Sequence, residues 1–128
     1  MSKVLEKNVF NHVFPYLILH QLFSEDNSGF KPNDSAINRI LAILENVYRG
    51  FDDSKDSIFI SLDISKAFDR VWHEGLLFKL KQLGITGSLH AWFASYLSNR
   101  RQKVVISGSG SSFKHTHAGV PQGSILGP

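Results

Sequence analysis

Apolar residues recur with a helical period through the first part of the chain. The spacing predicts a helix over residues 1–22, which Pro15 should kink because proline removes a hydrogen-bond donor and crowds the preceding turn. A polar loop follows, and Asn33 or Asp34 at its end suits the cap of a second helix that ends near Gly50. The apolar stripe of this second helix consists of Ile37, Ile40, Leu41, Leu44, Val47, Tyr48 and Phe51.

The period then changes from helical to alternating. Apolar side chains at every second position of Ser57–Ile64 predict a strand with one buried face. The polar segment Asp52–Asp56 just before it is the most suitable boundary within the chain.

Two shorter helices and a hairpin are predicted after this strand. A leucine stripe over residues 76–83 indicates the first helix, which Gly84 can end. The segments Arg101–Ser107, Gly108–Ser112 and Phe113–His117 have the pattern of a strand, a loop and a second strand. The second helix is striped by Leu89, Trp92, Phe93, Tyr96 and Leu97.

Composition narrows the class of protein. The 128 residues are 42% hydrophobic and include 10 Phe, 3 Tyr and 2 Trp, which excludes a disordered or collagen-like chain. Cysteine is absent, so there is no disulfide partner and no thiolate metal site. Polar residues interrupt the apolar positions near the N-terminus, so neither a signal peptide nor a membrane partner is expected. We expect an intracellular globular protein, in the nucleus or the cytoplasm, whose net charge of +3 permits an anionic partner.

One carboxylate stands out because aspartate is depleted in strands. Asp63 lies between Leu62 and Ile64 at the carboxyl end of the predicted strand, and alternation points it away from the apolar face. It is either an exposed residue that caps the following turn or a carboxylate that holds Mg²⁺. A two-metal site would need a further carboxylate from elsewhere.

Three other groups of residues have both a structural and a chemical interpretation. Phe68 and Trp72 are spaced as core partners on one helical turn, while a turn could also bring Phe68 beside Asp63; Asp69 suits a helix cap. Small residues flank Gln122, so the backbone there either forms an ordinary turn or approaches a flat ligand closely.

The remaining candidate groups are basic or contain histidine. The stretch Arg100-Arg101-Gln102-Lys103 is either a solvated junction between helix and strand or a contact for phosphates. The six histidines lack metal-ligand spacing, and His115 and His117, which share one strand face, have no third ligand nearby.

Several ordered segments together resemble one family. Leu62–His73, read as L-D-I-S-K-A-F-D-R-V-W-H, resembles the first catalytic-carboxylate motif of reverse transcriptases from non-LTR retrotransposons. Ser28–Pro32, S-G-F-K-P, resembles the fingers motif of that family, and Gly119–Pro128, G-V-P-Q-G-S-I-L-G-P, resembles its glutamine-bearing motif. Ser95–Gln102 fits the jockey and CR1-like branches. The chain is therefore identified as a partial reverse transcriptase domain.

The resemblance implies an α+β fold, a fragment of the right-hand polymerase fold. Residues 1–55 would form the mainly helical fingers side, and residues 56–128 would form the palm part. In the family, Asp63 matches the aspartate that binds two Mg²⁺ ions, and the backbone carbonyl of Ile64 matches the adjoining ligand. The implied partners are an RNA template, a DNA primer and deoxynucleoside triphosphates.

The resemblance also implies a nucleotide-binding set. Phe68 matches a steric gate that leaves no room for a ribose 2′-hydroxyl, and Lys66 and Ala67 match the turn whose amides approach the triphosphate. Gln122 and Gly123 match the pair that lines the incoming nucleotide and the template base.

The resemblance assigns Lys31 to the template side, where the family usually has arginine. Lysine keeps the charge but loses the planar bidentate fork. Arg100, Arg101 and Lys103 complete the candidate nucleic-acid contacts.

One family feature is missing from the printed sequence. The second catalytic motif, an aromatic-Ala-Asp-Asp hairpin, does not occur, since the only Asp-Asp pair is Asp52-Asp53. The Gly- and Pro-rich ending at Gly119–Pro128 also closes no element, which favours a fragment. We therefore expect no primer extension from these 128 residues alone. The alternative is a non-catalytic retrotransposon relic that acts at most as a weak nucleic-acid-binding or interaction module.

Overall fold

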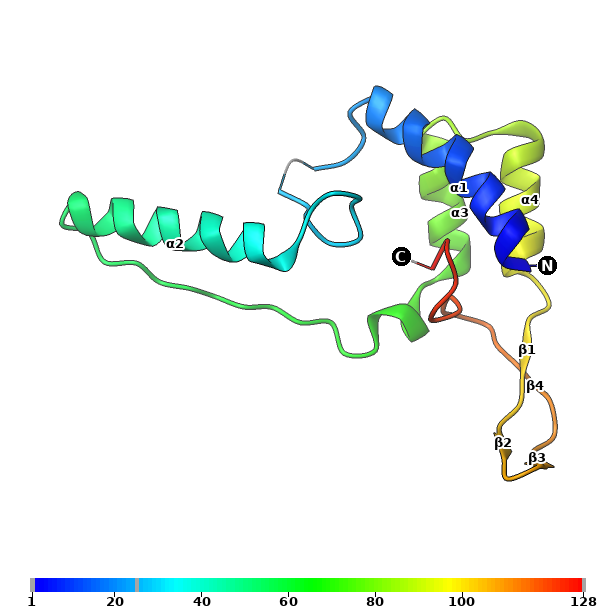
Figure 1. Ribbon diagram of the computed structural model, residues 1–128. Coiled ribbons are helices and arrows are strands. Elements are labelled where there is room, and N and C mark those ends of the chain that lie inside the picture. The colour runs from blue at the N-terminus through cyan, green and yellow to red at the C-terminus, as the bar shows by residue number, and fades with distance from the viewer. Residues whose placement is uncertain (1, 25, 128) are drawn as a thin grey trace. The chain divides into compact units, whose positions relative to one another are not determined.

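The computed structural model describes residues 2–24 and 26–127 (Figure 1). Pro128, the last residue of the predicted glutamine-bearing segment, lies outside the described residues. The chain forms two compact units, one made of residues 1–7 with 64–128 and the other of residues 8–63. Helices and two small sheets give a mixed α and β architecture. Among the residues described, no helix is long and apolar enough to cross a membrane.

The two predicted N-terminal helices are present. Helix α1 covers Ser2–Leu19 and contains Pro15, and helix α2 covers Ala36–Asp52, so α2 continues past Gly50. The residue that caps α2 is Ser35, whose Oγ accepts a hydrogen bond from the Asn38 N–H at 3.3 Å.

The predicted cap of α2 was therefore wrong by one or two residues. An N-cap needs extended backbone, which Ser35 has (φ −146°, ψ 158°), whereas Asn33 lies in the left-handed region (φ 64°). Asp34 supports the cap from outside, because its carboxylate accepts the Ser35 N–H at 2.7 Å.

The predicted strand Ser57–Ile64 was wrong: this segment is neither helix nor strand (Figure 1). Its apolar side chains are open to solvent, with Ile58 87%, Ile60 77% and Leu62 92% exposed. A strand needs a neighbour to take its backbone hydrogen bonds, and the strands in the described residues pair only with each other, farther along the chain.

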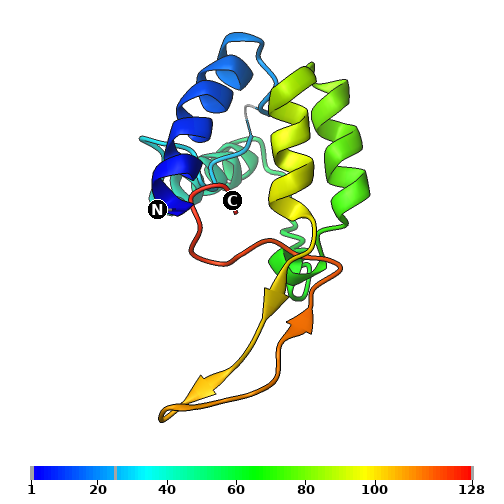
Figure 2. The same ribbon diagram turned by 90° about the vertical axis from the view of Figure 1, so that its right-hand side faces the viewer.

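The helices α3 and α4 are confirmed and pack against each other (Figure 2). α3 covers His73–Gln82 and α4 covers Gly87–Leu97, and a short 3₁₀ helix, η1 at Ala67–Arg70, precedes them. Gly84 follows α3 with φ 86°, a left-handed conformation typical of a glycine that ends a helix. The buried core of this unit is formed by Ile85, Phe93 and Leu97.

A β-hairpin follows α4, as the sequence predicted (Figure 2). β1 (Arg101–Gln102) pairs with β4 (Lys114–His115), and β2 (Val105–Ile106) pairs with β3 (Ser109–Gly110), both antiparallel. The predicted loop Gly108–Ser112 was too long, because the structure turns at residues 107–108.

The two ladders of the hairpin differ in register by one residue. Gln102 lies opposite Lys114, while the Ser111 N–H bonds to the Val104 carbonyl at 2.8 Å. Two residues, Ser112 and Phe113, therefore stand opposite the single residue Lys103. This is a β-bulge, which re-aims the side chains next to it.

Candidate functional site

The backbone of the first motif is joined to that of the glutamine-bearing segment. The Val120 N–H donates to the Phe68 carbonyl and the Gly119 N–H donates to the Val71 carbonyl, each at 2.8 Å. The Gly119 carbonyl in turn lies 2.7 Å from Nε2 of His73, at the start of α3. Segments about fifty residues apart in sequence are thus held side by side by three hydrogen bonds.

Gly119 permits this close approach. A Cβ at this position would lie 2.9 Å from the Cα and the carbonyl oxygen of Asp69, closer than a real side chain is found. Its φ of 86° is also in the left-handed region, which favours glycine. The close approach to Asp69 and the left-handed backbone therefore both favour glycine where this segment meets η1.

Side chains also bridge the two segments. The Gln122 amide donates to the Asp69 carboxylate at 3.4 Å, at the long end of a hydrogen bond. Asp69 lies within η1. The prediction that it caps a helix was wrong, because the residue at the N-cap of α3 is Trp72. The glutamine that the resemblance singled out thus contacts the first motif.

The C-terminal segment has a second anchor within the same unit. Glu6 is 5% exposed, and its Oε2 accepts a hydrogen bond from the Ile125 N–H at 2.8 Å. A buried carboxylate is costly unless it is hydrogen-bonded, so this contact ties the start of α1 to the residues just after Gln122.

The structure places the predicted nucleotide-binding residues around this junction. Phe68 is half-buried in η1, while Lys66 and Ala67, at the start of η1, are exposed. Lys66 has left-handed backbone (φ 55°), consistent with a tight turn. Gln122 and Gly123 are exposed, and nothing lies within 4 Å of a Cβ built on Gly123. The junction therefore offers open space next to Gln122.

Asp63 is exposed and immediately precedes this unit. Its carboxylate and the Ile64 carbonyl are oxygen donors of the type that Mg²⁺ prefers. Across residues 2–24 and 26–127, no three His, Asp or Glu side chains are grouped so that they could hold a metal ion. The donors fit a divalent ion in kind, and they supply only part of its coordination.

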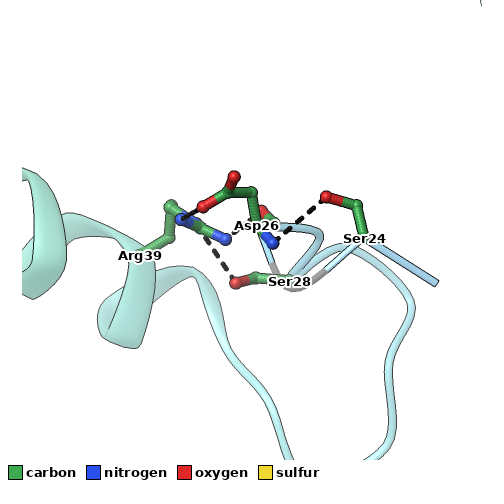
Figure 3. Close-up of polar contacts among 4 residues, drawn as sticks. All are labelled: Ser24, Asp26, Ser28 and Arg39. Atoms are coloured by element: carbon green, nitrogen blue, oxygen red, sulfur yellow. Dashed lines mark hydrogen bonds and ion pairs between the residues drawn. The ribbon is translucent and has the colours of Figure 1, made fainter. Parts of the chain in front are cut away.

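The loop that carries Lys31 is tied to α2 by Arg39 (Figure 3). The Arg39 guanidinium donates to Ser28 Oγ at 3.2 Å and to the Asp26 carbonyl, and it lies 3.6 Å from the Asp26 carboxylate. Ser24 Oγ accepts the Asp26 N–H at 3.3 Å. Lys31 itself is half-buried beside a hollow of about 330 Å³.

Three of the four predicted basic contacts, Arg100, Arg101 and Lys103, lie on or beside the hairpin. Arg100 is half-buried, with its guanidinium 5.1 Å from the centre of the Tyr96 ring and a 3.1 Å hydrogen bond to the Tyr96 carbonyl. Arg101 and Lys103 are exposed, and both lie over the Phe113 ring, at 5.5 and 5.1 Å.

Sequence reasoning missed four residues that hold these segments in place: Glu6, His73, Gly119 and Arg39. His73 and Gly119 belong to motifs that the sequence analysis identified, but the neighbouring residues do not indicate which remote residue each one contacts. Arg39 could have been suspected, because it is the only cation in residues 32–48 and follows a loop with a carboxylate at Asp26.

Comparisons with known proteins identify the class to which these motifs belong. The family model described as "Reverse transcriptase (RNA-dependent DNA polymerase)" matches residues 1–128. The chain belongs to the reverse transcriptase family. This family uses divalent metal ions, a nucleic-acid template and nucleotide substrates.

Individual relatives confirm the expected branch. The chain is 31% identical over 128 residues to the RNA-directed DNA polymerase from mobile element jockey of Drosophila melanogaster. It is 32% identical over 128 residues to the probable RNA-directed DNA polymerase from transposon BS of the same species. Over 69 residues it is also 32% identical to the retrovirus-related Pol polyprotein from type-1 retrotransposable element R2 of Popillia japonica.

The resemblance to reverse transcriptases of non-LTR retrotransposons is thus confirmed. All of this chain is covered by the jockey and BS matches, and it spans 14% of the length of each of those relatives. The R2 match covers 54% of the chain and 11% of that relative. No solved structure gave a significant match.

Proposed function

We propose that this chain is part of an RNA-directed DNA polymerase that works inside the cell on an RNA template and a DNA primer. It adopts part of the right-hand polymerase fold, with residues 1–55 on the fingers side and residues 56–128 in the palm. The observation that supports this most strongly is the Val120–Phe68 hydrogen bond of 2.8 Å, with its neighbour between Gly119 and Val71. These bonds join the segment with the gate residue to the segment with the glutamine.

The residues at this junction bind and select the nucleotide. Phe68, held by its backbone to Val120, occupies the space that a ribose 2′-hydroxyl would need, so deoxynucleotides fit and ribonucleotides clash. Lys66 and Ala67 present backbone amides to the triphosphate. Gln122 and Gly123 line the nucleotide and the template base, where the open space next to Gly123 leaves room for a flat ring.

Asp63 and Ile64 supply oxygen ligands to a divalent ion, Mg²⁺ by preference. A pair of such ions, held in part by Asp63 and the Ile64 carbonyl, would supply activation of the primer 3′-hydroxyl and stabilisation of the leaving pyrophosphate. Asp63 is suited to this task because its carboxylate is exposed. Lys31, Arg100, Arg101 and Lys103 contact the nucleic-acid backbone.

The test is primer extension by a jockey-type polymerase in which this 128-residue segment replaces its own counterpart. We expect RNA-templated extension that depends on a divalent ion. Asp63→Asn should lower the rate at least about 100-fold, since even the loss of an outer-shell metal partner can cost that much. The matched control is Asp56→Asn, which removes an exposed carboxylate from the preceding polar segment. Full activity of the Asp63→Asn chimera would refute the assignment.

A further inference from the structure

Acidic and basic residues are distributed unequally along the chain. Every Asp and Glu lies before residue 75, whereas residues 75–128 contain no carboxylate side chain. Although the net charge of the chain is only +3, residues 75–128 are strongly cationic. The six basic residues of that part are Lys79, Lys81, Arg100, Arg101, Lys103 and Lys114. Four of these six lie at or in the hairpin.

One face of the hairpin combines two exposed cations with three exposed rings. Residues directly opposite in an antiparallel pair share a face, so Arg101 and His115 lie on the same side. Lys103 lies two residues after Arg101, and both cations contact the Phe113 ring. We call this surface the ring face; it consists of Arg101, Lys103, Phe113, His115 and His117.

The rings on this face remain open to a ligand. Phe113 is 61% exposed even with two cations beside it. His115 and His117 are exposed, and their rings lie nearly parallel, with centres 6.3 Å apart. The opposite face carries the pair Gln102 and Lys114 and, two residues before Gln102, Arg100, which is half-buried with its guanidinium over the Tyr96 ring.

We propose that the ring face binds single-stranded nucleic acid. Its cations neutralise phosphates, and its rings stack on unpaired bases, the combination used by proteins that track single strands. A duplex presents no free base faces to such rings, so its binding would use the charges alone. The inference rests on the proposed function, to which it adds a docking surface outside the junction between Phe68 and Gln122.

The proposal is tested by measuring how a fluorescent oligo(dT) binds to the chain. A length of about 12 nucleotides is within the usual site size of one small domain. Phe113→Leu keeps the apolar bulk and removes the ring, so affinity should fall about fivefold or more. Affinity for a duplex of the same length should change less than twofold. Equal losses on both ligands, or none on either, would overturn the stacking role.

A matched pair of charge variants tests which face binds. Lys103→Gln and Lys114→Gln remove the same charge from opposite faces of one hairpin. Lys103→Gln should weaken oligo(dT) binding and lower the slope of log affinity against log salt by about one, while Lys114→Gln should do neither. Equal effects of the two variants would show a response to net charge and would refute a one-sided surface. Competition by polyglutamate as strong as that by oligo(dT) would also refute it.

The result is separable from the proposed polymerase function. Binding of a deoxynucleoside triphosphate to the same variants reports on the junction near Gln122, which the hairpin substitutions leave intact. If Lys103→Gln and Phe113→Leu alter neither ligand, the ring face fails alone. If wild-type chain binds oligo(dT) through the ring face yet shows no nucleotide binding, the assignment of the nucleotide site near Gln122 fails and the surface stands.

Discussion

Helices α2 and α4 both carry a stripe of apolar residues at helical spacing, and the surroundings of the two stripes differ. α4 buries Phe93 and Leu97 to 8% and 3% exposure by packing against α3. None of residues 36–52, all of them described, is buried in α2, where Leu41 is 58% exposed. The difference teaches that a helical period reports the shape of a segment, whereas burial depends on a partner that the period does not specify.

The same contrast separates the two segments to which we assign the proposed chemistry. The junction of η1 with the Gly119–Gln122 segment is fixed by hydrogen bonds between remote residues. The segment before it, with Ile58, Ile60 and Leu62, has apolar side chains that stay exposed. Residues of the proposed nucleotide site are therefore positioned within one unit, while Asp63 follows a segment that lacks regular structure.

The largest expected effect is a difference in the free energy of unfolding between substitutions in α4, which packs against α3, and in α2, which has no buried residue. Leu97→Ala should lower the free energy of unfolding by about 3 kcal/mol, because it leaves a cavity beside α3. Leu41→Ala should change it by less than about 0.5 kcal/mol, because the side chain is already in water. Urea unfolding followed by far-ultraviolet circular dichroism, which reports on the helices of both units, measures both. Similar losses at the two sites would contradict the contrast.

The next effect tests the junction. Gly119→Ala should cost about 2 to 3 kcal/mol, because left-handed backbone disfavours alanine and its Cβ would press on Asp69. Gly108→Ala is the control, since its φ of 83° is similar and no atom lies within 4 Å of the added Cβ. It should cost only about 1 kcal/mol. The same urea titration compares them, and equal costs would mean that the close approach is unimportant.

Sequence reasoning recovered the helices and the hairpin because their signals are local. It failed for Ser57–Ile64, since alternation describes a strand only when a neighbouring strand takes its hydrogen bonds. For the site, the sequence motifs identified Phe68 and Gln122, and in the structure backbone hydrogen bonds join the segments that carry them. The Gln122–Asp69 and His73–Gly119 contacts span 53 and 46 residues, and no local pattern specifies such distant pairs.

The smallest effect concerns the cap of α2. The Ser35 N–H bonded to the Asp34 carboxylate lowers the pKa of that group below 3.8, with help from the side chains of Ser28 and Asn38. The interaction is present above the ordinary pKa and is lost as the pH falls through the lowered value. The Ser35 amide resonance should therefore titrate with a midpoint below 3.8. Asp34→Asn should abolish this titration, and a midpoint above 3.8 would contradict the assignment.

The most direct test of the central claim, that the junction of η1 with the glutamine-bearing segment selects the nucleotide, is incorporation by the jockey-type chimera. Phe68→Val should lower the preference for deoxynucleotides over ribonucleotides about tenfold or more, because the smaller side chain admits a 2′-hydroxyl. Phe78→Val, at an exposed aromatic of α3, should leave the preference unchanged. An unchanged preference in Phe68→Val would contradict the claim.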